Sequence, residues 1–189
     1  LSFMLKHGAS KVVIVPKQFR GFDHEQMIAG LKPSLPDLQH VIVVGGAGDN
    51  SFEKLLSEPV WEDAPDANEI LTRHRPGPDD ITQLIYTSGT TGEPKGVMHS
   101  ANTTMANIVP YAERLHLGAD DVVLMASPMA HQTGFMYGLM MPIMLRCSVV
   151  LQDIWDAKKA IDLIRAEGVT FTMASTPFLM IFAGKLAAR

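Results

Sequence analysis

Small hydroxyl and glycine residues crowd one short segment of this 189-residue chain. The segment contains, in order, Thr87, Ser88, Gly89, Thr90, Thr91 and Gly92, and Lys95 comes shortly after them. Glycines let backbone N–H groups approach phosphate oxygens closely, hydroxyl groups add donors that can rotate, and the lysine brings a positive charge. The pattern therefore predicts a loop that binds a polyphosphate.

A flexible Ser/Gly linker and two known phosphate loops are the alternatives for this segment. A linker does not fit, because the strand-like run 81–86 leads directly into the segment and the apolar run 96–98 follows it. The Walker A pattern requires Ser or Thr after its lysine, and Gly96 stands there instead. The kinase-type G-x-G-x-x-G pattern does not match this segment either. The glycines at 45–48 do not complete it either, so a plain turn is expected there.

The stretch from Tyr86 to Val97, Y-T-S-G-T-T-G-E-P-K-G-V, resembles the signature loop of the adenylate-forming superfamily. This superfamily includes acyl- and aryl-CoA synthetases, firefly-luciferase-like enzymes and nonribosomal-peptide adenylation domains. In these enzymes the loop holds the β- and γ-phosphates of ATP while a carboxylate attacks the α-phosphorus. The resemblance assigns that role here to Thr87, Ser88, Gly89, Thr90, Thr91, Gly92 and Lys95.

A second segment, Ser127 to Phe135, is similar to the superfamily's P-x-x-H-x-x-G motif. The resemblance implies that His131 and Gly134 bind the substrate, whereas one histidine in an apolar region is otherwise more often a core residue. The region 129–151 most resembles short- and medium-chain fatty-acid or cyclohexanecarboxylate-type CoA ligases. The methionines around His131 suit an adaptable acyl pocket and an ordinary helix core equally: Met125, Met129, Met136, Met140, Met141 and Met144.

The resemblance implies a two-step reaction. ATP activates a fatty or alicyclic carboxylic acid as acyl-AMP, and the acyl group then passes to CoA. A cradle of N–H and hydroxyl donors together with Mg²⁺ stabilises charge that builds on phosphate oxygens. ATP, Mg²⁺ and CoA are thus the expected cofactors of the parent enzyme. Two alternatives stay open: transfer to the phosphopantetheine of a carrier protein, and a nucleotide- or acyl-binding module without catalysis.

Several motifs of the superfamily are missing, and both ends of the chain look cut. The Mg²⁺-binding glutamate, the ribose-binding aspartate and the adenylation lysine of the C-terminal domain are absent, so no catalytic residue is expected here. We expect part of a truncated N-terminal domain that does not turn over alone. Its two portions are residues 1–75, of βαβ type with a Pro-rich acidic connector, and residues 76–189, with the phosphate loop and the acyl pocket.

Charge and cysteine content exclude some classes of protein. Lys+Arg 16 against Asp+Glu 20 gives a formal net charge of −4, without the basic footprint of a nucleic-acid binder. The one cysteine, Cys147, cannot form an internal disulfide, so the composition fits a reducing compartment, the cytoplasm. Cys147 itself fits a small buried residue. Residues 122–145 carry no formal charge, but Pro128, Pro142 and a polar cluster favour a buried strand, a turn and a helix over a membrane span.

Strand-like and helix-like patterns alternate along the chain, which predicts an α/β fold of mostly parallel sheets covered by helices. Asp23 is expected to cap the second helix, and Gly168 to end the helix 155–167. Asn102 and Thr103 offer a start for the helix 104–115. Strands are expected at 11–16, 41–44, 81–86, 146–151 and 169–173, and further helices at 1–8, 23–31, 68–73 and from 176 onward.

Overall fold

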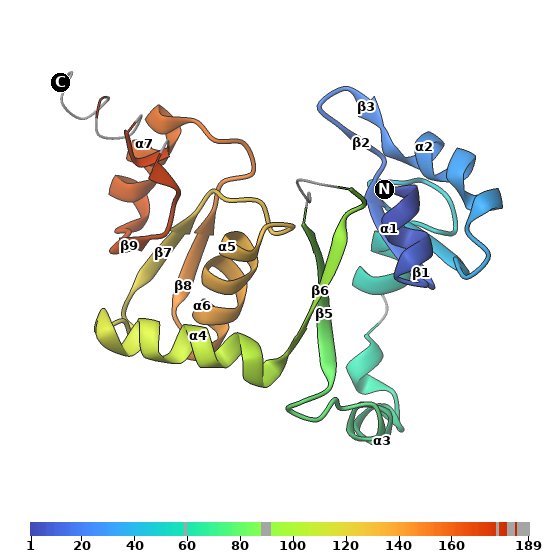
Figure 1. Ribbon diagram of the computed structural model, residues 1–189, viewed down its shortest axis with the longest axis horizontal. Coiled ribbons are helices and arrows are strands. Elements are labelled where there is room, and N and C mark those ends of the chain that lie inside the picture. The colour runs from blue at the N-terminus through green and yellow to red at the C-terminus, as the bar shows by residue number, and fades with distance from the viewer. Residues whose placement is uncertain (59, 88–91, 177, 181–183, 185–189) are drawn as a thin grey trace. The chain divides into compact units, whose positions relative to one another are not determined.

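The protein forms two compact units, and Figure 1 shows the elements of each. Unit 1 comprises residues 1–76 and 88–95, and unit 2 comprises residues 77–87 and 96–189. The predicted division of the chain after residue 75 stays a prediction. The computed structural model describes residues 1–58, 60–87, 92–176, 178–180 and 184.

Unit 1 is built on a parallel strand–helix–strand motif. β1 (Val12–Pro16) pairs in parallel with β4 (His40–Val44), and α2 (His24–Leu31) lies between them in the sequence. The core gathers around Ile28, a fully buried residue of α2. Its other buried members are Val15, Leu35, Leu38 and Val43. The predicted βαβ motif is therefore confirmed.

The remaining elements of unit 1 are short, as the Pro-rich composition of its second half predicts. The predicted helices at 1–8 and 68–73 are both present. The elements are α1 (Ser2–His7), β2 (Gln18–Phe19), β3 (Phe22–Asp23), η1 (Lys32–Ser34), η2 (Glu53–Ser57), η3 (Trp61–Asp63) and α3 (Ala67–Arg73).

Side-chain hydrogen bonds hold two points of the strand–helix–strand motif, the start of α2 and the turn after β4. Oδ1 of Asp23 accepts a 2.8 Å hydrogen bond from the N–H of Gln26, which confirms the predicted cap of α2. At the end of β4 the chain turns through Gly45, whose φ is +72°. Glu53 holds this turn, since its carboxylate accepts hydrogen bonds from Ser51 Oγ (2.7 Å) and Gly45 N (3.0 Å). These bonds, the one from Ser51 foremost, hold the pKa of Glu53 below its ordinary value.

Unit 2 contains a parallel sheet of three strands in the order β8-β7-β9. The central strand is the most buried, with Val123, Leu124 and Met125 at most 2% exposed. Parallel strands linked by helices confirm the α/β class. The elements are β5 (Ile81–Thr87), β6 (Lys95–Ser100, in this unit from Gly96 onward), α4 (Ala101–Arg114), β7 (Val122–Met125), α5 (Gln132–Phe135), η4 (Met136–Met140), α6 (Met141–Leu145), β8 (Ser148–Leu151), α7 (Ala157–Glu167) and β9 (Phe171–Thr172).

The uncharged segment 122–145 folds as predicted, as strand β7, a turn and the helices from α5 to α6. In the part of the chain that the structure describes, no helix has the length and apolar character needed to cross a bilayer. Gly168 ends α7 in the left-handed conformation, with φ +64°, as expected from the sequence.

Candidate functional site

The predicted phosphate loop connects two paired strands. Thr87 is the last residue of β5 and Lys95 is the first of β6, and both are exposed. The short connection 88–94 fits a hairpin, because parallel strands need a much longer crossover. Thr87 and Lys95 are therefore the predicted site residues on either side of this connection in the sequence.

Packing against β5 explains why a glycine, Gly96, follows Lys95. A side chain at this position would place its Cβ 2.9 Å from Leu84 Cδ1 and 3.5 Å from Tyr86 Cε1. The two side chains of β5 thus cover the backbone of β6 directly after Lys95. The same glycine that excludes Walker A thus lets Leu84 and Tyr86 pack closely over β6.

Most of the predicted loop cannot be placed. Ser88, Gly89, Thr90 and Thr91 lie outside the described residues. Gly92 is described and exposed. The role of the whole loop in binding ATP phosphates stays a prediction.

The far end of β6 runs directly into α4, and here the predicted start of the helix was wrong. The helix begins at Ala101, and Ser100 caps it. Ser100 Oγ accepts from the N–H of Thr103 (3.3 Å), and Thr103 Oγ1 accepts from the N–H of Ser100 (2.9 Å). Asn102 has another role, since its Nδ2 donates to Asp79 Oδ1 at 2.7 Å.

His131 stands after β7 at the start of α5, and its side chain is exposed. Its Nδ1 accepts a 3.2 Å hydrogen bond from the N–H of Thr133. A nitrogen that accepts from an N–H carries no hydrogen itself, so the ring hydrogen is on Nε2. The ring therefore offers an N–H donor that is suited to a carboxylate.

Gly134 is buried, and close packing explains why it is glycine. An added Cβ would overlap the carbonyl oxygen of Pro128 and would lie 2.7 Å from that of Ser127. Gly138 packs in the same way, with its would-be Cβ 2.9 Å from Met125 Cβ. The two glycines let this helical segment approach the end of β7, which places His131. A direct contact between Gly134 and substrate stays a prediction.

The methionines divide into core and surface residues. Met136 and Met141 belong to the buried cluster with Ile108, and Met140 and Met144 pack against it. Met125 is 1% exposed. Met129, next to the His131 loop, is 38% exposed. An ordinary core thus accounts for most of the set.

One polar side chain near His131 was missed by the sequence analysis. Both amide atoms of Gln132 are buried, and neither has a hydrogen-bond partner among the described residues. An unpaired buried amide destabilises a fold unless something else satisfies it. Nothing in the sequence distinguishes this glutamine, because its burial depends on tertiary packing.

Three titratable groups of unit 2 have a pKa that partial burial raises. Burial raises the pKa of Tyr111 and of Tyr137, and the Tyr137 hydroxyl donates to Asn107 Oδ1 at 2.7 Å. Burial also raises the pKa of the Cys147 thiol. A protonated thiol is a poor nucleophile, in line with the predicted packing role of Cys147.

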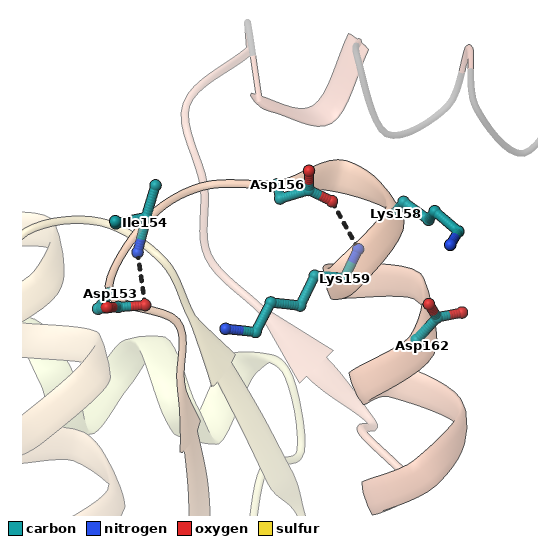
Figure 2. A pocket seen from close by; sticks show the side chains of 6 residues that line it. All are labelled: Asp153, Ile154, Asp156, Lys158, Lys159 and Asp162. Carbon is teal, nitrogen blue, oxygen red and sulfur yellow. Dashed lines mark hydrogen bonds between the residues drawn. The ribbon is translucent and has the colours of Figure 1, made fainter.

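A hollow of about 530 Å³ opens beside the start of α7, and charged side chains line it (Figure 2). Two of its carboxylates accept backbone hydrogen bonds: Asp153 from Ile154 N (2.8 Å) and Asp156 from Lys159 N (2.7 Å). The hollow contains no predicted site residue. Across the described ranges, no three His, Cys, Asp or Glu side chains are grouped so as to hold a metal ion.

Comparison with known proteins assigns the family. The model of the family "AMP-binding enzyme" matches residues 1–188. A medium-chain fatty-acid–CoA ligase of Escherichia coli is 30% identical over 179 residues, covering 95% of this chain and 31% of the relative. A benzoate–CoA ligase of Thauera aromatica is 31% identical over 152 residues, covering 79% of this chain and 26% of the relative. The chain thus spans a third or less of the length of these relatives.

Solved structures support the same fold. A putative long-chain fatty-acid CoA ligase of Rhodopseudomonas palustris superposes with a TM-score of 0.77 at 24% identity, covering 97% of this chain and 42% of that one. The N-terminal domain of FACL13 from Mycobacterium tuberculosis gives 0.70 at 22% identity, covering 96% of this chain and 41% of that one. With the family match over nearly every residue, the chain belongs to the AMP-binding enzyme family of adenylate-forming acyl-CoA ligases.

Proposed function

We propose that this chain supplies the ATP-phosphate loop and part of the acyl site of an AMP-forming acyl-CoA ligase. The observation that carries the proposal is the hairpin β5–β6, in which Thr87 and Lys95 flank the hydroxyl- and glycine-rich connection. A family match over residues 1–188 supports it. ATP, CoA and a small carboxylic acid are its proposed ligands, and the parent protein is proposed to be cytoplasmic.

In the first step, these residues would bind the ATP phosphates and orient the substrate carboxylate. Lys95 and the Thr87 hydroxyl, with the amides of the loop, would hold the β- and γ-phosphates as negative charge grows on the departing pyrophosphate. The Nε2–H of His131 would donate a hydrogen bond to one oxygen of the substrate carboxylate. The other carboxylate oxygen would attack the α-phosphorus of ATP. Fixing both reactants in one geometry removes much of the entropic barrier of the first step.

The second step transfers the acyl group. The thiol of CoA attacks the carbonyl carbon of acyl-AMP, the bond to the phosphate oxygen breaks, and AMP leaves. We propose a fatty or alicyclic acid as substrate, because the relatives include ligases named for medium-chain fatty acids. We propose free CoA as acceptor for the same reason.

The test uses the full-length parent protein and the replacement Lys95→Gln. Exchange of labelled pyrophosphate into ATP, with a panel of acids, measures the first step, and thioester formation with CoA or a carrier protein measures the second. We expect Lys95→Gln to lower kcat/KM for ATP by roughly 10- to 100-fold, because it removes one charge-assisted contact. Lys158→Gln, an exposed lysine of α7, is the control.

Two results would contradict the proposal. One is a Lys95→Gln parent that exchanges pyrophosphate as fast as the native protein. The other is carboxylate-dependent exchange by the 189-residue chain alone, since we propose that this chain does not turn over. Acyl transfer to a carrier protein but not to CoA would correct only the acceptor.

A further inference from the structure

A groove of about 490 Å³ in unit 1 is lined by residues of η3, of α3 and of the turn that joins them. Its walls are apolar, because Trp61 comes from η3, and Ile70 and Leu71 come from one face of α3. Ala64 and Ala67 also line it, and their small, half-buried side chains leave the space between the walls open. We call this hollow the α3 groove.

Hydrogen bonds hold the walls of the α3 groove in place. Nε1 of Trp61 donates to the carbonyl oxygen of Leu55 at 3.0 Å, which fixes the indole ring although Trp61 is 59% exposed. The N–H of Ala64 donates to Trp61 O (3.2 Å), and the N–H of Ala67 donates to Ala64 O (3.0 Å). Leu71 on the other wall is 65% exposed. Exposed apolar surface that is held in advance can bind a partner with little loss of conformational entropy.

The charge along the α3 groove is negative. Glu62 and Asp66 line it, and no basic residue does. All five charged residues of the segment 58–69 are acidic, and the arginines that follow, Arg73 and Arg75, leave five acidic groups against two basic ones. The rest of the chain has 15 acidic and 16 basic residues, so this one segment accounts for the excess of negative charge on the protein.

The two carboxylates of the groove are not neutralised within the described structure. Neither Glu62 nor Asp66 forms a side-chain hydrogen bond or an ion pair with any residue that the structure describes. Asp66 stands at the N-cap position of α3 without capping it through its side chain. Lys54, the nearest lysine in the sequence, pairs with Asp49 at 3.8 Å instead. The carboxylates are therefore available to cations of a partner.

We propose that the α3 groove docks a basic amphipathic helix of a partner protein. Apolar side chains at positions i and i+3 or i+4 of that helix enter between Trp61 and Leu71. Its Lys or Arg side chains, which flank the apolar stripe, contact Glu62 and Asp66.

Charge and exposure distinguish this occupant from others. The carboxylates repel phosphate groups, so nucleic acids and anionic lipid surfaces do not fit the α3 groove. Small ligands bind in pockets that bury most of their surface, whereas Trp61 and Leu71 are each more than half exposed. A half-open apolar groove with an acidic lining fits one face of a basic helix.

The test titrates the 189-residue chain with a synthetic helix of about 18 residues that carries one stripe of leucines and lysines elsewhere. We expect binding that weakens as salt rises, and no binding of the same peptide with glutamate in place of lysine. Leu71→Ser should raise Kd about tenfold. Glu62→Gln combined with Asp66→Asn should raise it roughly fivefold. Ala67→Leu should also weaken binding, because the larger side chain fills the groove without changing its charge.

Matched controls change the same residue types in unit 2. They are Leu151→Ser, at a residue that is 57% exposed, and Glu113→Gln combined with Asp120→Asn, at two exposed positions. None of these should change Kd, and circular dichroism verifies the fold of every variant. Replacing both Glu62 and Asp66 by lysine should reverse the preference, so that the chain binds the glutamate peptide and not the lysine peptide.

Trp61 reports on the groove directly. The chain has two tryptophans, Trp61 and Trp155. A peptide that covers the Trp61 ring should shift the emission of the native chain to shorter wavelength. Trp155→Phe should keep this shift, and Trp61→Phe should abolish it.

Several results would overturn the proposal. They are the absence of binding, equal affinity for the lysine and glutamate peptides, and equal losses in the groove variants and their controls. A free chain whose sedimentation shows a dimer that Leu71→Ser dissociates would make a second copy the occupant instead. A full-length parent that does not bind the lysine peptide would show that its own chain covers the groove. None of these results depends on the proposed ligase activity.

Discussion

The hydroxyl of Thr170 donates a 2.7 Å hydrogen bond to Oδ1 of Asp121 and accepts one from the N–H of Val122 at 3.0 Å. The other carboxylate oxygen of Asp121 accepts from Gly118 N at 2.7 Å. The backbone carbonyl of Asp121 accepts from Ser148 N at 3.3 Å. Asp121 thus joins the starts of three strands: its carboxylate and the Thr170 hydroxyl connect β7 with β9, and its backbone carbonyl connects β7 with β8.

Thr170→Val should destabilise the chain and weaken its pH dependence. The hydrogen bond from Thr170, followed by that from Gly118, lowers the pKa of Asp121 from its ordinary 3.8. A lowered folded pKa means that this stabilisation is full above pH 3.8 and is lost as pH falls through the folded value. Urea unfolding at neutral pH should show a loss of about 1 kcal/mol. Thr170→Ser keeps the hydroxyl, and a loss as large as that of valine would contradict the assignment.

Gly134→Ala should destabilise the chain strongly. The added methyl would overlap the Pro128 carbonyl, and relief requires a shift of the backbone at the end of β7. Overpacking of this kind costs about 1–3 kcal/mol. The control is Gly30→Ala in α2, where no atom lies within 4 Å of the new Cβ. That change should stabilise the chain by about 0.5–1 kcal/mol, because alanine favours the helix. Two equal changes in denaturation midpoint would contradict this reading.

Local sequence signals predicted the elements that depend on local interactions. Asp23 caps α2 through a residue three positions away, and Gly168 ends α7 by its own backbone conformation. Short continuous runs of β-branched and apolar residues were sufficient to predict the strands β1, β4 and β7.

Features that depend on contacts between distant segments could not be predicted. The predicted contact of Gly134 with substrate stays a prediction, and its close packing against the Pro128 carbonyl is a second reason for glycine that the motif alone did not indicate. The start of α4 was misplaced because Ser100, Asn102 and Thr103 are all good capping residues in one short run. The structure selects Ser100, since Asn102 bonds to Asp79, 23 positions earlier in the chain.

Ser100→Ala should destabilise α4 by about 1 kcal/mol, since it removes the acceptor for the N–H of Thr103. Thr103→Val removes the reciprocal bond to the N–H of Ser100. Because both changes affect one capping box, the double variant should lose less than the sum of the single losses. Thermal unfolding of the four proteins measures this coupling. Additive losses would show that the two bonds act independently.

Gln132→Met should stabilise the 189-residue chain, although it replaces a polar residue beside the candidate site. Methionine keeps a similar length and removes the two amide atoms that are buried without partners in the described structure. The relief should be about 1 kcal/mol in urea unfolding. Gln26→Met is the control, because Gln26 is exposed. A destabilised Gln132→Met chain would show that the amide is satisfied in solution.

His131→Asn separates the two roles of this histidine. Asparagine can still accept the N–H of Thr133 as a helix cap, but it removes the imidazole donor. The chain should keep its denaturation midpoint, whereas His131→Ala should lose about 1 kcal/mol of stability. In the full-length parent, both variants should show a similar fall in pyrophosphate exchange, by roughly 10- to 100-fold, with the acid KM raised. If the His131→Asn parent exchanged pyrophosphate at the native rate, His131 would only cap α5.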